Sequence, residues 1–496
     1  MPQMRLDLDL AARSARRWPA RPALTVDGCW WSHAELNVRA EKLAARLHLA
    51  GVRKGDRVGI LALNHLAHFD LLLAAPKLGF IYTPFNHRLP ADETAALLAY
   101  VRPCLLLVDA ANAALVQQFT DPQVQLEHYA AWLAEAEGKA APAPSLTSED
   151  IHMLLFTGGS TGTPKGALLP YRQTLANVVA TVQGWRLTRD DCAIQATPCF
   201  HAALNVYSTP LLAIGGRVVL MPSFEPGEYL RLMQATRATR LFMVPTMFRM
   251  LAEHAAFASA DFSSAHGAIS GGAPCPPALR ARFAARGIAF SQGFGMTEAG
   301  VNCFVISQAE ASAEPLAVGR PLRGLRAVIR RPDGTPCTAG EVGELTLAGA
   351  QVCAGYFERE QEWAECYRDG WLWTGDLARV DANGLIFITG RRKEMFISGG
   401  ENVYPAEVEA ALSAHPDIIE CAVLGVPHAT WGEVGLAAIA LRADAQVDAS
   451  SFEAWLRQHV AGYKRPRELL FLPALPKTAA GKFNKPEIRR LHAARQ

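Results

Sequence analysis

The early part of the chain alternates between helix-like and strand-like patterns of apolar residues. Ser32 and Glu35 have the spacing of a capping box, and the apolar stripe that follows ends at Gly51. The stripe consists of Leu36, Ala40, Leu43, Ala44 and Leu47. Residues 56–63 then predict a buried strand with a further helix behind it. The alternation resumes after an Ala/Pro-rich stretch at 138–144 and predicts α/β layers with mostly parallel sheets.

The pattern changes between about residues 324 and 390. Asp333-Gly334 and Asn383-Gly384 each lie between short apolar runs, and each pair predicts a hairpin turn. We therefore expect this segment to be antiparallel, in a small barrel-like arrangement.

Strand and helix patterns alternate once more after this segment. Helices are predicted over 405–412 and 452–460, and strands over 421–426 and 468–472. The predicted fold class is thus α/β. A large N-terminal domain of layered sheets, with the barrel-like part, covers residues 1–390, and a small C-terminal α/β domain covers 394–496.

Composition and charge narrow the function classes. The 496 residues are 50% hydrophobic and 19% charged, which excludes disorder as the dominant state. Lys and Arg total 49 against 47 Asp and Glu, so nothing in the charge favours a nucleic acid partner. We expect no membrane span, because no apolar stretch reaches ~18–20 residues. The 10 cysteines are scattered without a Cys-x-x-Cys pair, which argues against zinc and disulfides and favours a cytoplasmic location.

A loop rich in glycine and hydroxyl groups follows a predicted buried strand at 153–156. Its backbone N–H groups can turn toward an anion, its hydroxyls can donate further hydrogen bonds, and Lys165 adds a positive charge. The Walker pattern is excluded, because Pro164 precedes this lysine and Gly166 follows it. We expect a phosphate-binding loop rather than an ordinary surface loop. Its predicted ligands are Thr157, Gly158, Gly159, Ser160, Thr161, Gly162, Thr163 and Lys165.

This loop resembles the phosphate loop of the adenylate-forming (AMP-binding) superfamily, which includes acyl- and aryl-CoA synthetases, luciferases and peptide-synthetase adenylation domains. The family's usual second residue is serine, where this chain has Gly158. Further family motifs follow in order over nearly the whole chain, and the strongest likeness is to fatty-acyl and aryl-CoA ligases. The resemblance implies ATP, Mg²⁺ and coenzyme A, with a small carboxylic acid as the other substrate.

Two later segments resemble the family's adenine site. Residues 291–298 resemble the aromatic-Gly-x-Thr-Glu motif, with Phe294 in place of the usual tyrosine. The resemblance implies that Phe294 stacks on adenine, Thr297 contacts phosphate and Glu298 holds Mg²⁺. Residues 269–274 resemble the other wall of the adenine slot, which is formed by small residues. These are Gly272, Ala273 and Pro274.

The remaining motifs imply the ribose and catalytic residues. Asp376 resembles the aspartate that binds both ribose hydroxyls, a role that suits a carboxylate, and Arg391 resembles the arginine that also reaches the ribose. Residues 475–482 resemble the motif that carries the catalytic lysine, which implies this role for Lys482. In the family the small C-terminal domain is mobile, and the match places its hinge at 391–393. The glycines implied to face the thiol are Gly399 and Gly400.

The acid and thiol sites can be predicted only coarsely. His201 matches a family position beside the acyl pocket, where it would gate the carboxylate or orient the thiol. Residues 201–207 lack the aspartate that holds an amino-acid substrate, so we expect a fatty or aryl acid. Candidate pocket residues are Asn205, Tyr207, Phe242, Met243, Thr246, Met247, Asn302 and Cys303. Candidates for contacting coenzyme A are Arg88, Trp431, Lys464, Arg465 and Arg467.

The leading hypothesis is an ATP-dependent acid–CoA ligase that forms an acyl-adenylate, releases pyrophosphate and transfers the acyl group to the coenzyme A thiol. One alternative is a ligase that loads the phosphopantetheine of an acyl carrier protein. Another is a non-catalytic nucleotide-binding relative, which the joint presence of Lys165, Glu298, Asp376, Arg391 and Lys482 disfavours. The sequence leaves open which acid is used and whether the chain forms a homodimer.

Overall fold

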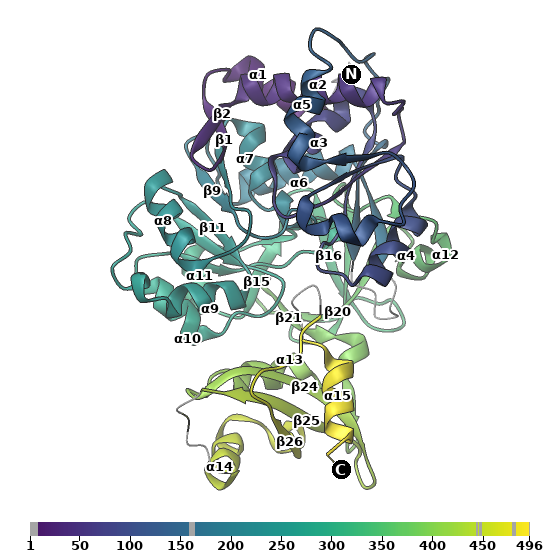
Figure 1. Ribbon diagram of the computed structural model, residues 1–496. Coiled ribbons are helices and arrows are strands. Elements are labelled where there is room, and N and C mark those ends of the chain that lie inside the picture. Colours follow the sequence, from purple (N-terminus) through teal and green to yellow (C-terminus); the bar gives the residue numbers. More distant parts are fainter. Residues whose placement is uncertain (1–7, 158–163, 443–444, 446–448, 479–482, 496) are drawn as a thin grey trace.

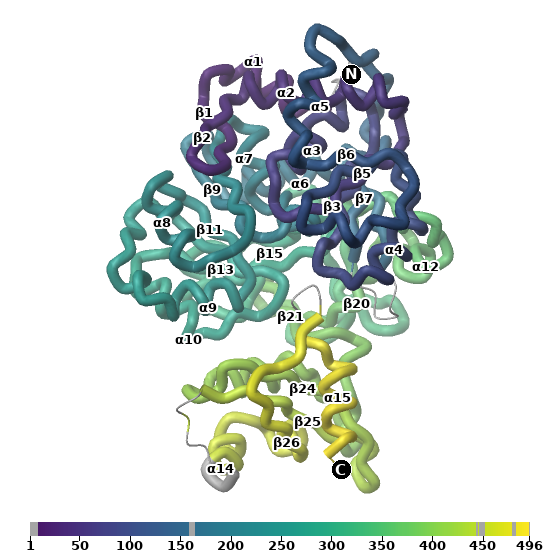
Figure 2. Tube along the Cα trace, viewed as in Figure 1, coloured from purple at the N-terminus to yellow at the C-terminus, as the bar shows by residue number. Residues whose placement is uncertain are grey.

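The computed structural model describes residues 8–157, 164–442, 445, 449–478 and 483–495. Its chain forms a large N-terminal body and a smaller C-terminal unit that lies beneath it in Figures 1 and 2. The predicted α/β fold class is confirmed. None of the described helices is both long and apolar enough to cross a membrane.

Three seven-stranded sheets form the N-terminal body, and the order of the strands within the first two could not be deduced from local patterns. The first sheet has the order β13-β12-β11-β9-β10-β1-β2. Its strands are β1 (Pro22–Val26), β2 (Cys29–Ser32), β9 (Cys192–Gln195), β10 (Arg217–Leu220), β11 (Arg240–Met243), β12 (Gly267–Ser270) and β13 (Phe290–Gln292). All neighbours in it are parallel except β1 and β2.

The second sheet has the order β18-β8-β7-β4-β3-β5-β6. Its strands are β3 (Arg57–Leu61), β4 (Ile81–Pro84), β5 (Leu105–Val108), β6 (Gln123–Gln125), β7 (Ile151–Thr157), β8 (Lys165–Pro170) and β18 (Gly355–Tyr356). The parallel part ends at β7, because β8 returns antiparallel to it and β18 pairs antiparallel with β8. This edge brings Gly355 and Tyr356 beside Leu168 and Ala167, shortly after Lys165.

Helices fill the space around the two sheets, and one large apolar core joins them. Leu24 of β1, Leu43 of α2, Ile60 of β3 and Phe69 of α3 all belong to it. The helices are α1 (Leu10–Arg17), α2 (His33–Leu49), α3 (Leu66–Leu78), α4 (Ala91–Val101), α5 (Tyr129–Ala134), α6 (Tyr171–Gly184), α7 (Ser208–Ile214), α8 (Pro226–Thr236), α9 (Pro245–Glu253), α10 (Pro277–Ala284), α11 (Gln308–Ala313) and α12 (Glu360–Cys366).

The first long helix shows how local sequence sets an element. Ser32 Oγ accepts a hydrogen bond from the Glu35 N–H at 3.2 Å, and the Glu35 carboxylate accepts one from the Ser32 N–H at 2.7 Å. Both bonds of the predicted capping box are therefore present, and α2 begins at His33. The predicted apolar stripe is fully buried.

The third sheet is antiparallel and curled, as the turn signals predicted. It comprises β14 (Phe304–Val305), β15 (Ala317–Pro321), β16 (Leu325–Arg330), β17 (Gly343–Gly349), β19 (Tyr367–Arg368), β20 (Trp371–Val380) and β21 (Ile386–Arg391). Turns at the two predicted positions connect its strands. The Gly334 N–H donates to the Arg331 carbonyl and the Gly384 N–H to the Asp381 carbonyl.

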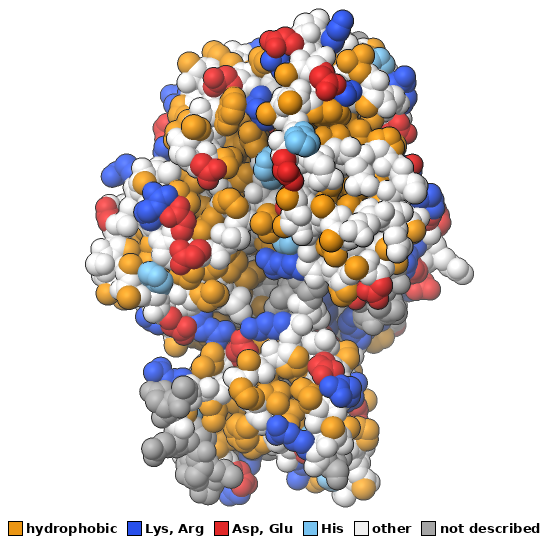
Figure 3. All heavy atoms as spheres, in the orientation of Figure 1, with side chains coloured by type: hydrophobic (Ala, Val, Ile, Leu, Met, Phe, Trp, Pro, Cys, Tyr) orange, Lys and Arg blue, Asp and Glu red, His pale blue; other side chains and the backbone are white. Residues whose placement is uncertain are grey.

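The C-terminal unit is a five-stranded sheet with three described helices. The elements are β22 (Phe396–Ser398), β23 (Glu401–Val403), α13 (Pro405–Leu412), β24 (Ile418–His428), β25 (Gly432–Leu441), α14 (Ala449–His459), β26 (Glu468–Phe471) and α15 (Lys485–Ala493). The short helix η6 (Arg392–Glu394) connects it to β21. Figure 3 shows Lys and Arg side chains gathered where the two units face each other.

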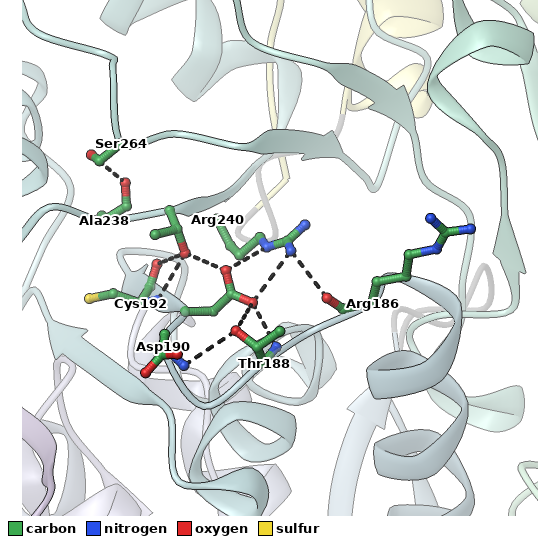
Figure 4. Close-up of polar contacts among 9 residues, drawn as sticks. Arg186, Thr188, Asp190, Cys192, Ala238, Arg240 and Ser264 are labelled. Carbon is green, nitrogen blue, oxygen red and sulfur yellow. Dashed lines mark hydrogen bonds and ion pairs between the residues drawn. The ribbon is translucent and has the colours of Figure 1, made fainter.

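A buried polar cluster lies where β9 and β11 of the first sheet begin (Figure 4). The Asp191 carboxylate accepts hydrogen bonds from Arg240 Nε at 2.9 Å, Thr239 Oγ1 at 2.7 Å and the Thr188 N–H at 2.8 Å. Burial alone would raise the pKa of Asp191, but these hydrogen bonds outweigh it and lower that pKa. The cluster fixes the strands whose opposite ends carry the site.

Candidate active site

The ends of two antiparallel strands hold the predicted phosphate loop. Thr157 ends β7 and Lys165 begins β8, and these two residues are paired across the ladder. The remaining predicted ligands, Gly158 to Thr163, lie outside the described residues. Strand pairing therefore brings Lys165 back beside the strand that leads into the loop.

Lys165 contacts an acidic residue that the sequence analysis did not identify. Its Nζ lies 2.6 Å from Glu362 Oε2, and Glu362 Oε1 accepts a hydrogen bond from Arg359 Nη1 at 2.9 Å. The hydrogen bond from Lys165 is the main cause that lowers the pKa of Glu362. Lys165 Nζ also lies 5.1 Å from the centre of the Tyr356 ring.

Tyr356 connects this lysine to Glu298, the predicted Mg²⁺ ligand. The buried Tyr356 hydroxyl donates to Glu298 Oε1 at 2.9 Å. Burial, and then the Glu298 charge, raise the pKa of Tyr356, so the phenol remains a hydrogen-bond donor. The Glu298 backbone is fixed as well, because its carbonyl accepts from the Cys353 N–H at 2.7 Å.

The arrangement around Glu298 fits a magnesium nucleotide. A carboxylate offers about four lone-pair sites, and the Tyr356 hydroxyl takes one of them. No group of three or more metal-ligating side chains occurs among the described residues. Mg²⁺ at Glu298 would thus draw its other ligands from phosphate oxygens and water, which is its usual mode of binding beside nucleotides.

The small-residue wall of the predicted adenine slot follows β12, and the aromatic segment follows β13. Gly272, Ala273 and Pro274 are exposed, and Gly272 has φ +81°, a conformation that favours glycine. The Gln292 amide ties this wall to the next strand. It donates to the Ala273 carbonyl at 3.1 Å, and its oxygen accepts from the Cys275 N–H at 2.9 Å.

The aromatic residue of the slot is half-buried. The Phe294 ring packs at 56° to the buried ring of Phe304, with their centres 5.6 Å apart. Thr297 and Glu298 follow it in a short helical turn, and the Thr297 carbonyl accepts from Gln173 Nε2 at 2.9 Å. Both parallel strands end at this edge of the sheet, which is where ligands bind in such folds.

The predicted ribose residues pair across β20 and β21. Asp376 and Arg391 are register partners, and Arg391 Nε lies 2.8 Å from the buried Asp376 Oδ1. Cys303 lies near both this carboxylate and Glu298. Burial raises the pKa of Cys303 to about 12, and the Asp376 and Glu298 charges act in the same direction. The structure thus brings the predicted ribose and Mg²⁺ residues to one region.

The predicted acyl-pocket residues fall into two groups. Asn205, Tyr207, Met243, Asn302 and Cys303 are buried. Asn205 accepts a hydrogen bond from Thr209 Oγ1 at 2.7 Å, and Asn302 donates one to Thr181 Oγ1 at 3.0 Å. Both side-chain amides therefore form hydrogen bonds within the protein interior.

Three pocket candidates keep an accessible surface: Phe242, Thr246 and Met247. They lie on β11 and the first turn of α9. His201 is half-buried after β9, and its ring centre is 4.5 Å from that of Phe200.

Lys482 lies outside the described residues, but residues on either side of it are placed. Lys477 and Phe483 form an isolated antiparallel bridge. Lys477 Nζ lies 2.6 Å from Glu420, and Lys485 Nζ lies 2.7 Å from Glu394. Carboxylates therefore hold the chain on both sides of the predicted catalytic lysine.

Gly399 and Gly400 form the two-residue turn between β22 and β23. Both have positive φ, +60° and +88°, as such a turn requires. A Cβ at Gly399 would lie 2.6 Å from the Trp431 ring, so only glycine fits there. The hinge candidate Lys393 is exposed within η6.

The C-terminal candidates for contacting coenzyme A already have partners within their own unit. The Arg467 guanidinium lies 4.5 Å from the centre of the Trp431 ring. Lys464 Nζ lies 2.5 Å from Glu407, and Arg465 Nε donates to the Val460 carbonyl at 3.0 Å. Arg88, in the N-terminal body, is exposed just after β4.

Glu362 and Tyr356 are the contacts that sequence reasoning missed. Both are distant from Lys165 along the chain, and only the pairing of β18 with β8 brings them near it. The available signal was Gly355-Tyr356 followed by an acidic helix, which has no meaning until that pairing is known.

The chain matches known protein families along most of its length. The family described as AMP-binding enzyme matches residues 11–357, and its C-terminal domain family matches residues 407–482. Feruloyl-CoA synthase of an Amycolatopsis species is 39% identical over 96% of this chain and 97% of its own. Indoleacetate–CoA ligase of Aromatoleum aromaticum is 33% identical over 97% of both chains.

A solved structure shares the whole fold. O-succinylbenzoate coenzyme A synthetase from Bacillus subtilis, in complex with ATP and magnesium ion, has a TM-score of 0.87 and 27% sequence identity. The match covers 97% of this chain and 99% of that one.

Proposed function

The chain belongs to the AMP-binding enzyme family as an acid–CoA ligase, and from this premise we propose that the acid it activates is aromatic. The observation that carries the proposal is the 39% identity to feruloyl-CoA synthase over 96% of the chain. The named acids of that relative and of the indoleacetate–CoA ligase both carry an aromatic ring.

The accessible pocket residues support an aromatic acid. The Phe242 ring lies against Gly271, where an added Cβ would come within 3.0 Å of it. Because Gly271 has no side chain, the ring can lie against its backbone, and the accessible part of the ring would offer an aromatic surface to a second ring. Thr246 and Met247, half-buried on the first turn of α9, would add one hydroxyl and one adaptable apolar group.

We propose that the first step joins the acid to AMP. A carboxylate oxygen attacks the α-phosphorus of ATP while the bond from that phosphorus to the bridging oxygen breaks, and pyrophosphate leaves with that electron pair. Lys482 would neutralise the two anions that meet. Lys165, Thr157 and the loop between them would bind the departing phosphates. Mg²⁺ at Glu298, when bound, supplies further positive charge to the phosphates.

The second step transfers the acyl group to a thiol. The sulfur attacks the carbonyl carbon of the adenylate, AMP leaves, and the thiol proton goes to a base or to water. Asp376 and Arg391 would hold the ribose through both steps, with Phe294 against the adenine and Gly272 on its other side. His201, half-buried after β9, would orient the carboxylate or the thiol.

Coenzyme A is the proposed acceptor, because the named relatives are CoA ligases. Its phosphates would meet Arg88 or the Lys464, Arg465 and Arg467 group, and its pantetheine would pass Gly399 and Gly400. The carrier-protein alternative uses the same thiol chemistry. It would be favoured if the adenylate accumulates with coenzyme A present but is consumed by a pantetheinylated carrier protein.

The test is a panel of acids matched in size. Ferulic, indoleacetic and decanoic acids are assayed for acid-dependent pyrophosphate exchange and for AMP release that requires coenzyme A. We expect ferulic acid to give the highest kcat/KM. A decanoic acid rate equal to or above it would contradict the aromatic assignment.

The role of Lys482 is tested in the same assay. Lys482→Ala should abolish acid-dependent pyrophosphate exchange while ATP still binds, since the two anions then meet without its charge. Lys139→Ala, at an exposed position, is the matched control and should behave as wild type. Normal exchange in Lys482→Ala would remove this lysine from the first step.

A further inference from the structure

Glu420 of β24 makes contacts that its place in a strand does not explain. Its side chain is 8% exposed, and its two oxygens face the loop that leads toward Lys482. Glu420 Oε2 accepts from the Leu475 N–H at 3.1 Å, and Oε1 lies 2.6 Å from Lys477 Nζ. One carboxylate therefore holds both the backbone and the side chain of the predicted catalytic segment.

A third cation reaches this carboxylate from the N-terminal body. Arg249 of α9 places Nη2 3.4 Å from Glu420 Oε1, and its Nη1 donates to the Ile419 carbonyl. Arg249 is 22% exposed, so the contact is partly shielded from water. Figure 1 shows α9 on the edge of the N-terminal body that faces the C-terminal unit.

The backbone of β24 is shaped for this contact. Its register against β25 shifts between Ile418 and Glu420, so Ile419 is an extra residue in the ladder. A bulge turns one carbonyl away from the neighbouring strand. Here that carbonyl is the one that Arg249 binds.

Helix α9 also carries two of the accessible acid-site candidates. Thr246 and Met247 lie on its first turn, and Arg249 lies on the next turn of the same rigid element. Helix α9 thus connects the acid-site candidates to Arg249, which contacts Glu420, and Glu420 in turn contacts Lys477.

We propose that Glu420 is a positioning residue for the adenylation step, and that Arg249 is its partner in the N-terminal body. The proposal rests on the acid–CoA ligase function and on the role of Lys482 given above. Glu420 and Lys477 belong to the same unit and stay together when that unit turns. Arg249 contacts Glu420 in the orientation seen here, so the ion pair would stabilise this orientation, to which the proposal assigns adenylation.

The expected effects separate the two half-reactions. Arg249→Ala should slow acid-dependent pyrophosphate exchange by about tenfold, the scale of one partly buried ion pair with a hydrogen bond. Thioester formation from supplied acyl-adenylate should stay within about twofold of wild type. Arg249→Lys keeps the charge but has a single ammonium for the two partners, so it should recover only part of the exchange rate. Arg231→Ala, which removes an exposed ion pair of α8, is the matched control.

A double-mutant cycle tests the pairing itself. Glu420→Gln should also slow exchange, and the combined variant should lose less than the sum of the two single losses, because the two side chains share one contact but each has others of its own. Additive losses, equal loss in both half-reactions, or unchanged exchange in Arg249→Ala would each overturn the proposal.

The experiments distinguish an error in the proposed function from an error in this inference. Wild-type exchange with the acid panel decides the function, whereas the ratio of variant to wild type decides the positioning role. If wild type shows no exchange, trypsin cleavage at the exposed Arg392 and Lys393 provides the second readout. Arg249→Ala should then be cut several-fold faster than wild type, and an equal rate would overturn the proposal.

Discussion

At the scale of single residues, the structure changes the picture of Lys165 most. Its place in the sequence predicts a phosphate ligand, and its place at the start of β8 agrees with that role. Yet Glu362 and Tyr356 contact it, and neither could be predicted, because their proximity depends on strand pairing far along the chain. The role of Lys165 thus stays a prediction from the sequence, and the side chains that contact it could not be predicted.

Removing the Glu362 charge should strengthen phosphate binding. The carboxylate competes with phosphate for Lys165, and a partly exposed ion pair is worth ~1 kcal/mol at most. We expect Glu362→Gln to lower the inhibition constant of pyrophosphate by about two- to fivefold. Product inhibition of the forward reaction measures this directly.

Glu365→Gln is the control for that experiment, because Glu365 is exposed on the same helix. It should leave pyrophosphate inhibition unchanged. Weaker inhibition in Glu362→Gln would mean that Glu362 helps Lys165 bind phosphate by orienting it, and the competition argument would be wrong.

At the scale of elements, prediction succeeded where the signal was local. The capping box before α2, the turns at Gly334 and Gly384, and the helix Pro405–Leu412 each depend on residues within a few positions. The order of strands in the two large sheets could not be predicted. The contact between β1 and β10, for example, joins residues that no local pattern connects.

The Asp191 cluster at the start of β9 and β11 makes a contribution to the free energy of unfolding that can be measured. Asp191→Asn leaves Arg240 partly buried without its carboxylate, a loss of about 3 kcal/mol for such pairs. We expect Tm to fall by about 5 °C, measured by calorimetry at neutral pH. Asp190→Asn is the adjacent control, because the Asp190 side chain is 77% exposed and should cost little.

The direction of the Asp191 pKa shift determines how the stability contributed by this cluster depends on pH. The pKa of Asp191 is lowered in the folded state, so its contribution is complete above the unfolded pKa near 4. It is lost as pH falls through the folded pKa. The Tm difference between wild type and Asp191→Asn should therefore shrink below about pH 4, and a constant difference would contradict the assignment.

At the scale of the whole molecule, the question is how one site serves two steps. Lys482 is proposed to act at the α-phosphate, and a thiol must later reach the same carbonyl carbon. Gly399 and Gly400, proposed for that second step, lie in the same small unit as the catalytic segment. The resemblance predicted a hinge at 391–393, where Arg391 ends β21 and η6 begins at Arg392. Motion there remains a prediction.

Proline at Lys393 should separate the two steps. Its fixed φ near −65° matches the φ range of a 3₁₀ turn, so the orientation seen here can form. Rotation at the same bond is then restricted. We expect Lys393→Pro to slow thioester formation by about tenfold or more while adenylation is largely kept, with the two half-reactions measured separately. Lys393→Ala removes the side chain without fixing φ and should leave both rates near wild type.

The two whole-molecule variants also make a joint prediction, because they act on one equilibrium in opposite directions. Arg249→Ala weakens a contact made only in the present orientation, whereas Lys393→Pro restricts departure from it. In the Lys393→Pro background, Arg249→Ala should therefore lower the adenylation rate by a smaller factor than it does in wild type. The reason is that the restricted backbone now holds the orientation that the ion pair favoured. If the loss is equally large in both backgrounds, Arg249 acts on the acid site through α9 rather than on orientation. Equal loss of both half-reactions in Lys393→Pro alone, or no loss in either, would leave Lys393 an ordinary surface lysine.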